Sequence, residues 1–537
     1  MHTAHAAADE VRATWLTTTG PDYITSGVFT ETTMNQLDNI GLNTVYTEVW
    51  KNGFTNFPSP TMQAAIGQDR SGFLGSRNLL HETTATAHRR GLIHGAWFEY
   101  GFSSGFRGSF DAGPGADNAL TSYARSNGWL LEDQNGDVVN SSNPFAWMNP
   151  AVPEVREFLI DITLEAIRDH DLDIVQFDDR LAWPNEFGYD ATTAALYFAE
   201  TGNNLPANPN NAAFKQWRQD KVTQFAIELN DAIDAYRPDL HTSVSPSVQG
   251  FAQDRFNADW ELWANLDLFD EYVPQVYRDN LNSFRNSLPS NTAVLANAGV
   301  LDKGVIGLRF NGTGADTPTA DFTQMIVDVA LANGGQLAGH AGFYNKGYDD
   351  NEAALTAFYG VDLDSPFFDA DHRPAPLTAG LSADLTSWIV DVPADEQFRL
   401  IAEYFNGTWA EIDSRLLLTA GQHSFVVPGA ISVELVVDRR PILGDTDFDR
   451  DVDLIDLIAL QAHLGGTGAI AEGDFNWDGV VDALDLALIE QNFGWGVPGS
   501  PSFADAFVVS PLVPEPGVVA LLAALGVFAS ARTRRMA

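Results

Sequence analysis

The segment Asn43-Thr-Val-Tyr-Thr-Glu-Val-Trp50 is a short apolar run, rich in β-branched and aromatic residues, which is typical of a buried strand. Similar runs recur up to about residue 345, separated by amphipathic segments such as 155–169 and 214–236. We predict strands at 11–17, 43–49, 92–99, 173–178, 241–245, 271–277, 292–296 and 336–343. Strands that alternate with helices in this way favour an α/β fold, a (β/α)8 TIM barrel over residues 10–362, with a doubly wound sheet as the alternative.

Composition narrows the classes of function. The chain has 537 residues, a formal net charge of −42 and no cysteine. Binding to nucleic acid needs clustered lysine and arginine, so we expect none. The absence of cysteine excludes disulfides, thiolate metal sites and cysteine nucleophiles.

Barrel enzymes carry their chemistry at the C-terminal ends of the strands. The predicted ends bear carboxylates, amides and aromatic rings, the side chains that a sugar site needs, because rings stack on pyranoses and carboxylates perform acid–base chemistry. Asn297 falls at the predicted end of the seventh strand. His94, His340 and Asp179 do not share ligand spacing, so no catalytic metal is predicted. We expect substrate contacts from Arg12, Trp15, Glu48, Trp97, Asp179, Gln275, Tyr277 and Tyr344.

Glycosidases need a proton donor and a second carboxylate that acts as nucleophile or base. We predict that Asp178 is one of the pair and that Asp179 binds Arg180, although alternation along a strand does not decide which aspartate enters the barrel mouth. Glu99 is the favoured second carboxylate, because neighbouring aromatic rings would shield it and raise its pKa; Glu48 is the alternative. An aspartate pair held in purely structural hydrogen bonds also stays open.

Several blocks then identify a resemblance. They are Arg12-Ala-Thr-Trp15, Asn43 to Trp50, His94-Gly-Ala-Trp97-Phe98, Met148-Asn149-Pro150, Phe177-Asp178-Asp179, Ser245-Pro246-Ser247 and Val273-Pro274-Gln275-Val-Tyr277. In this order they resemble the bacterial glycosyl-hydrolase-like family ten. The resemblance implies a TIM barrel that hydrolyses glycosidic bonds in a polysaccharide or peptidoglycan-type glycan. A non-catalytic glycan-binding surface protein on the same scaffold is the alternative.

This chain departs from the family pattern at two strand ends. Relatives commonly continue the third strand into Asn-Pro, where this chain has Glu99-Tyr100. After Ser245-Pro246 they often show Phe-Gly and an arginine, where this chain reads Ser247-Val248-Gln249. Because both departures lie at strand ends, we expect a shifted substrate preference.

Residues 365–441 alternate apolar and polar positions with Gly and Asn turns, which predicts a small β-sandwich for glycan binding or spacing. Between 442 and 496 an acidic segment recurs after 29 residues, with oxygen side chains at loop positions 1, 3, 5, 9 and 12, the spacing of an EF-hand-like Ca²⁺ loop. Arg450 stands where Gly479 makes the sharp turn, so we expect a weaker first site. The predicted ligands are Asp445, Asp447, Asp449, Asp453, Asp456, Asp474, Asn476, Asp478, Asp482 and Asp485.

The duplicated unit resembles a type I dockerin, which implies structural Ca²⁺ and a possible cohesin-like partner. The end of the chain, 511–537, has Val513-Pro-Glu-Pro516, an apolar run and three arginines. This tail resembles the PEP-CTERM sorting signal, which implies a membrane-spanning segment, an exosortase-type partner and a place at the cell surface or outside the cell. Residues 1–10 contain no apolar stretch, so we expect an export signal upstream of Met1.

Overall fold

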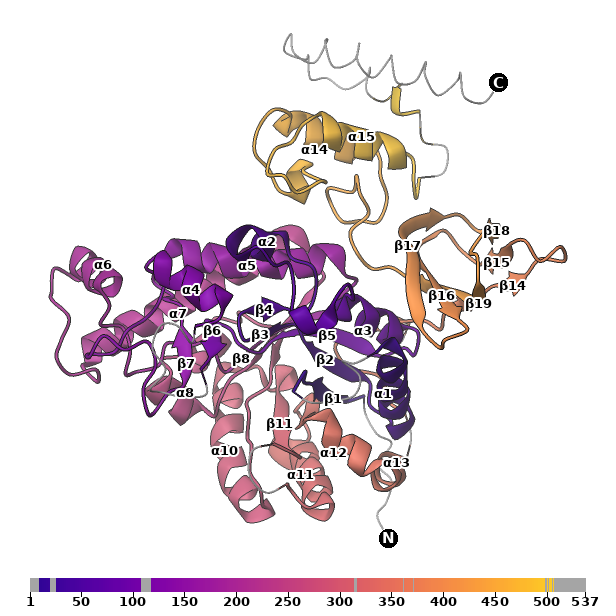
Figure 1. Cartoon of the computed structure of the whole chain (residues 1–537). Coiled ribbons are helices and arrows are strands. Elements are labelled where there is room, and N and C mark those ends of the chain that lie inside the picture. Colours follow the sequence, from indigo (N-terminus) through magenta and orange to yellow (C-terminus); the bar gives the residue numbers. More distant parts are fainter. Residues whose placement is uncertain are drawn as a thin grey trace.

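The computed structural model describes residues 9–19, 26–107, 117–312, 316–360, 362–369, 371–497, 500, 502–504 and 506. A large barrel, a small β-domain and a helical repeat follow one another along the chain (Figure 1). Within these residues no helix is both long and apolar enough to cross a membrane. The predicted sorting segment, 511–537, lies outside the described residues.

Eight parallel strands form the barrel, in the spatial order β10-β9-β8-β5-β2-β1-β12-β11. Bridges from Tyr272 to Gly304 and from Gln275 to Gly307 join the two outer strands and nearly close the sheet. The (β/α)8 prediction is confirmed, and the doubly wound alternative is wrong. The strands are β1 (Val11–Leu16), β2 (Thr44–Glu48), β5 (Ile93–Phe98), β8 (Ile174–Asp178), β9 (His241–Ser245), β10 (Glu271–Tyr272), β11 (Val305–Arg309) and β12 (Gly339–Phe343).

Helices surround the barrel and pack their apolar faces on the outward side of the strands (Figure 1). Side chains on the opposite face of the strands fill the interior, among them Trp15, Tyr46 and Trp97. The helices are α1 (Gly27–Ile40), α2 (Pro60–Ile66), α3 (Leu79–His88), α4 (Ala119–Ser126), α5 (Pro153–Asp169), α6 (Ala191–Thr201), α7 (Ala212–Tyr236), α8 (Gln249–Arg255), α9 (Trp260–Asn265), α10 (Leu281–Ala298), α11 (Thr319–Leu331), α12 (Asn345–Asp350) and α13 (Glu352–Tyr359). Two short antiparallel pairs follow two of the strands: the hairpin of β3 (Trp50–Lys51) with β4 (Phe54–Thr55), and β6 (Ser103–Phe106) with β7 (Phe145–Trp147), between which α4 lies in the sequence.

The seventh strand is not where the sequence predicted it. Residues 292–296 belong to α10, which begins after Asn280, whose side chain accepts the Ser283 N–H, and ends at Gly299 with φ +80°. Val305 to Arg309 form the strand instead. Asn297 therefore lies in the last turn of a helix and does not reach the barrel mouth.

The β-domain consists of two antiparallel sheets, β13-β19-β16-β17 and β14-β15-β18, that share one apolar core. Buried charges join it to the barrel: Arg373 donates hydrogen bonds to Asp171 and Asp173, which lie just before β8. The join is thus at the end of the barrel opposite the mouth. Its strands are β13 (Leu377–Thr378), β14 (Gly380–Leu381), β15 (Trp388–Val392), β16 (Glu396–Tyr404), β17 (Trp409–Leu418), β18 (Gly421–Phe425) and β19 (Ala430–Val437).

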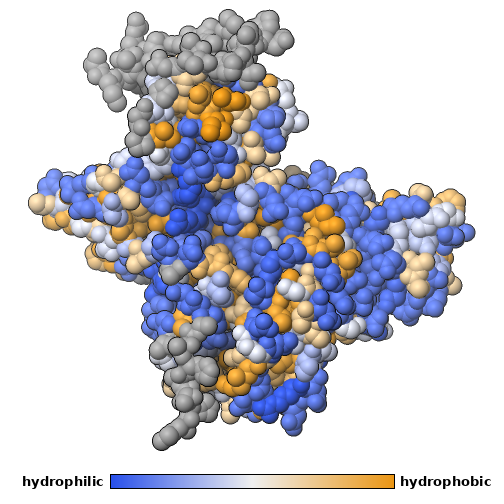
Figure 2. Space-filling view, turned by 180° about the vertical axis from the view of Figure 1, so that it is seen from behind, coloured by the Kyte–Doolittle hydropathy of each residue, from blue (hydrophilic) through white to orange (hydrophobic). Residues whose placement is uncertain are grey.

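The repeat forms two similar loop–helix units, ending in α14 (Leu454–His463) and α15 (Ala483–Asn492). Asp453 and Asp482 cap the two helices in the same way, each in a capping box with the aspartate three residues later. Figure 2 shows apolar side chains gathered on this module. Its exposed apolar residues are Ile455, Ile458, Val480 and Leu484.

Candidate active site

Asp178, the last residue of β8, points into the barrel mouth. Trp97 Nε1 donates a hydrogen bond of 2.9 Å to its Oδ2. Gln275 Nε2 and the backbone N–H of Asp179 both donate to its Oδ1. Because Trp97 and Gln275 come from other strand ends, these contacts place Asp178 among the C-terminal ends of the strands, whereas Asp179 lines the cavity above them.

Glu99 lies one residue beyond β5, beside the same mouth. Arg180 Nη1 is 3.0 Å from Oε1, and Lys51 Nζ is 3.8 Å from Oε2. Within the described part of the chain, the buried Oε2 has no hydrogen-bond partner. Burial, aided by the nearby charge of Glu48, raises the pKa of Glu99 to about 8 although Arg180 opposes the shift. Glu99 is therefore suited to carry a proton at neutral pH.

Asp179 completes a group of three carboxylates around one guanidinium. Its Oδ1 is 3.5 Å from Arg180 Nη1, and its Oδ2 accepts a hydrogen bond from Ser247. Burial raises the pKa of both Asp178 and Asp179, neighbouring carboxylates add to the rise, and Arg180 opposes it. The two cations Arg180 and Lys51 do not balance the four carboxyl groups of Glu48, Glu99, Asp178 and Asp179, which favours retention of a proton in the group.

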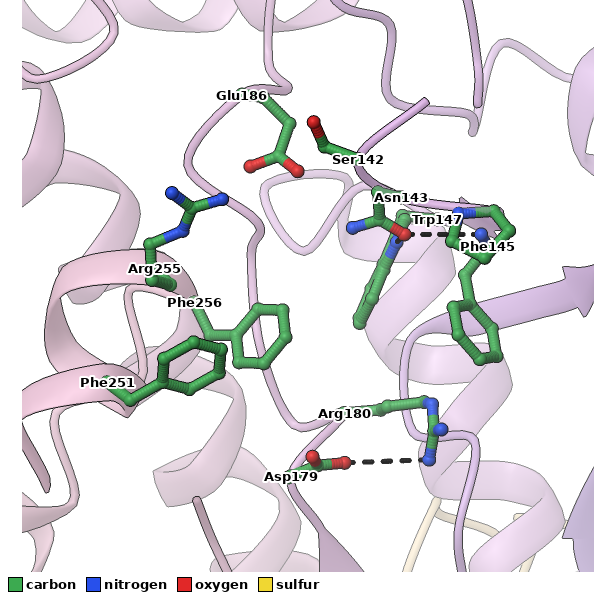
Figure 3. Close-up of a pocket in the computed structure, with 11 residues that line it drawn as sticks. Ser142, Asn143, Phe145, Trp147, Asp179, Arg180, Glu186, Phe251, Arg255 and Phe256 are labelled. Atoms are coloured by element: carbon green, nitrogen blue, oxygen red, sulfur yellow. Dashed lines mark hydrogen bonds and ion pairs between the residues drawn. The ribbon is translucent and has the colours of Figure 1, made fainter. Parts of the chain in front are cut away.

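A cavity of about 170 Å³ opens above Asp179 and Arg180. In Figure 3 these two residues lie at its base, with Phe145 and Trp147 on one side and Phe251 and Phe256 on the other. Phe251 is about half exposed, whereas Trp147 is buried. The phenylalanine rings thus offer an apolar surface next to the carboxylates, which suits a sugar ring.

Four of the predicted substrate contacts, Arg12, Trp15, Glu48 and Trp97, are buried and do not line the cavity. Arg12 is at the opposite end of the barrel, bound to Glu10 and stacked on Tyr359, so its prediction is wrong because the residue starts rather than ends its strand. Trp15 donates to Gln176 inside the barrel. Glu48 is fully buried, and its oxygens accept hydrogen bonds from Thr18 and Lys51.

The remaining predicted contacts lie near the mouth. Gln275 holds Asp178, and Asp179 lines the cavity. The half-buried Tyr277 packs edge-on against Trp15 and stacks on Phe343, and Tyr344 packs against Phe343. Arg180 was predicted only as a partner of Asp179, but it also binds Glu99.

Sequence reasoning missed most of the cavity wall. These residues lie in the long connection from β5 to α5, in the loop after β8 and in α8. The one available signal was the length of the β5–α5 connection, which is typical of a functional loop. The missed residues are Ser142, Asn143, Pro144, Phe145, Trp147, Glu186, Phe251, Arg255 and Phe256.

The first loop of the repeat is suited to a cation. Asp445, Asp447 and Asp449 place carboxylate oxygens within 4.8 Å of one another, as do Asp451, Asp453 and Asp456. Asp445 Oδ1 is buried without a hydrogen-bond partner among the described residues. Oxygen ligands in this arrangement fit Ca²⁺. Arg450 has φ +71°, and its side chain binds Glu396 of the β-domain.

The sequence comparisons with known proteins all find proteins described as glycosyl hydrolases or glycosyl hydrolase-like. The sequence profile of the family described as "Glycosyl hydrolase-like 10" matches residues 10–303. Glycosyl hydrolase DigH of Escherichia coli (strain K12) is 25% identical over 272 residues, 45% of this chain and 56% of the relative. Glycosyl hydrolase YngK of Bacillus subtilis (strain 168) is 25% identical over 149 residues, 24% of this chain and 28% of the relative. The chain spans little more than half the length of the first of these relatives.

The chain is also similar to several solved structures. The PgaB (BpsB) glycoside hydrolase domain from Bordetella bronchiseptica is 13% identical, covers 67% of this chain and 99% of that domain, and has a TM-score of 0.49. The catalytic domain of beta-amylase from Paenibacillus polymyxa is 11% identical, covers 66% of this chain and 98% of that domain, and has a TM-score of 0.45.

Proposed function

The chain belongs to the glycosyl hydrolase-like 10 family, and we propose that it is a glycoside hydrolase in which Glu99 and Asp178 are the catalytic pair. The observation that supports this most is the contrast between their surroundings. Glu99 Oε2 is buried without a hydrogen-bond donor, whereas three donors point at Asp178. Two carboxyl groups in one mouth with different environments take different roles.

Glu99 serves as the proton donor to the leaving oxygen. Its pKa of about 8 keeps it protonated at neutral pH, and the sugar bond needs a proton because an alkoxide is a poor leaving group. Lys51 and Arg180 stabilise the carboxylate that remains after proton transfer, since both lie within 4 Å of its oxygens.

Asp178 acts as nucleophile or base. Burial and the neighbouring carboxylates raise the pKa of Asp178, and the hydrogen bonds from Trp97, Gln275 and the Asp179 N–H oppose that rise and orient the carboxylate. Asp179 and Arg180, at the base of the cavity, bind sugar hydroxyl groups. The nearest oxygens of Asp179 and Glu99 are each within 3.5 Å of one Arg180 nitrogen.

The test is release of reducing ends from polysaccharides and peptidoglycan-type glycans. We expect release by the wild type and a loss of at least 100-fold in Asp178→Asn and Glu99→Gln. Binding without release by the wild type and both variants would instead favour the non-catalytic glycan-binding alternative. Gln68→Ala, outside the mouth, serves as the control and should retain wild-type activity.

We also propose that the repeat holds structural Ca²⁺ through Asp445, Asp447, Asp449, Asp453 and Asp456, and through the matching positions Asp474, Asn476, Asp478, Asp482 and Asp485. The exposed apolar residues of α14 and α15 would then meet a cohesin-like partner. The tail motif supports export and sorting to the cell surface by an exosortase-type enzyme. Ca²⁺ titration of the whole chain, and fractionation of producing cells, test these proposals.

A further inference from the structure

A second cavity adjoins the one above the carboxylates. It has a volume of about 400 Å³ and shares Ser142, Glu186 and Arg255 with the inner cavity. Figure 3 shows Ser142 and Glu186 at the end of the inner cavity that lies away from Asp179 and Arg180. The two cavities therefore form one continuous groove that leads from the carboxylates outward over the loops after β5, β8 and β9.

The walls of the outer cavity differ in chemistry from those of the inner one. Aromatic rings line the inner cavity, whereas the outer one is polar and is lined by four asparagines together with two serines, Pro209 and the charged residues Asp133, Glu186 and Arg255. An amide both donates and accepts hydrogen bonds, so it matches a hydroxyl or acetamido group and carries no charge. The amides of the outer cavity are Asn135, Asn140, Asn185 and Asn210.

Buried polar contacts hold these walls in place. Arg218 is fully buried and donates to the backbone and side-chain oxygens of Asn185 at 2.7 Å. The same guanidinium donates to the Pro209 carbonyl, so it ties together two separate loops. Across the groove, Asp133 accepts hydrogen bonds from the N–H groups of Asn135 and Asp137 and thereby shapes its loop. Such fixed walls favour binding, because little order is lost when a ligand enters.

We propose that this groove is an extended glycan-binding site, with one sugar unit in the inner, aromatic cavity and at least one further hydroxyl- or acetamido-bearing unit in the outer, asparagine-bearing cavity. With the unit on the far side of the cleaved bond, the substrate is a chain of three or more sugars. This inference rests on the proposed function for the position of the cleaved bond, but the groove itself binds whether or not hydrolysis follows.

Binding to Asp178→Asn, measured by titration calorimetry, tests the groove. The probes are β-1,4-linked N-acetylglucosamine oligomers and β-1,4-linked glucose oligomers, each of two and of six units. We expect the six-unit oligomer of at least one series to bind at least tenfold more tightly than its two-unit form. Glu99→Gln provides a second inactive background in case Asp178→Asn does not fold.

Two double variants test whether the outer cavity causes the gain in affinity with oligomer length. Asn135→Ala with Asn210→Ala alters two exposed amides of the outer cavity, and should lower the affinity for the six-unit oligomer at least tenfold. Asn127→Ala with Asn203→Ala alters two exposed amides outside both cavities. This control should retain the gain in affinity from two to six units. Three results would overturn the proposed binding site. They are equal affinity for two and six units, absence of binding in both series, and an equal loss of affinity in both double variants. Length-dependent binding without release of reducing ends by the wild type would overturn only the hydrolysis.

Discussion

The hydrogen bond from Trp97 to Asp178 allows a sharp test of the proposed pair. Trp97→Phe removes the indole N–H that lies 2.9 Å from Asp178 Oδ2 and keeps an aromatic ring in the barrel. The bond favours the charged carboxylate, so its loss raises the pKa of Asp178. If Asp178 acts in its charged form, the acidic limb of the kcat/KM profile moves to higher pH.

The size of the movement follows from the energy of the bond. A hydrogen bond to a charged group contributes about 1.5–3 kcal/mol, and one pKa unit corresponds to about 1.36 kcal/mol. The acidic limb should therefore move up by about 1–2 pH units. The plateau at higher pH should change less, because Gln275 and the Asp179 N–H still orient the ionised carboxylate.

Trp15→Phe is the matched control. Trp15 is likewise buried in the barrel, but its indole N–H donates to the neutral Gln176. Both variants lose similar packing, so thermal melting should report a similar destabilisation, while only Trp97→Phe shifts the pH profile. An unchanged acidic limb in Trp97→Phe, or the same shift in both variants, would refute the assignment of Asp178.

Three further predictions concern other parts of the molecule. Wild-type kcat/KM should fall as pH rises through about 8, where Glu99 loses its proton, and the residual activity of Glu99→Gln should lack this alkaline limb. Arg373→Met leaves Asp171 and Asp173 buried without their main cation. Denaturant unfolding should therefore show a free energy of unfolding lower by about 3–5 kcal/mol. Arg439→Met, a partly exposed control, should lower it by less than about 1 kcal/mol. Arg450→Gly places glycine at a left-handed backbone position, which glycine favours, and removes a positive charge. Calorimetry should therefore show tighter Ca²⁺ binding to the first loop. An unchanged affinity would contradict that reasoning.

The strands that the sequence predicted well are those whose apolar runs are bounded on both sides. The fifth predicted strand coincides with His241–Ser245, and the second differs from Thr44–Glu48 by one residue at each end. The prediction failed at 292–296, a short apolar run that belongs to a longer helix. Periodicity does not separate a buried helix face from a strand over five residues, and the caps at Asn280 and Gly299 were the signals that decide.

The site was predictable where a side chain ends a strand and was not where loops meet. Asp178 and Glu99 follow directly from strand ends, and the structure places both at the mouth. Arg12 failed because a residue near the start of a strand lies at the other end of the barrel. Phe251, Glu186 and Ser142 converge from three connections, and such convergence depends on loop conformations that no local pattern specifies.

On the proposed function, substrate preference is set by contacts separate from those that hold the catalytic pair. The carboxylates are held by neighbouring strands through Trp97, Gln275 and Arg180. The groove is held separately, through buried contacts such as Arg218 with Asn185 that do not touch the carboxylates. Changes in the loops can therefore alter which sugars bind without moving the acid or its partner. The departures from the family pattern at Glu99-Tyr100 and at Ser247-Val248-Gln249 lie beside the carboxylates. On the proposed function, we therefore expect them to act on the sugar next to the cleaved bond more than on sugars farther along the groove.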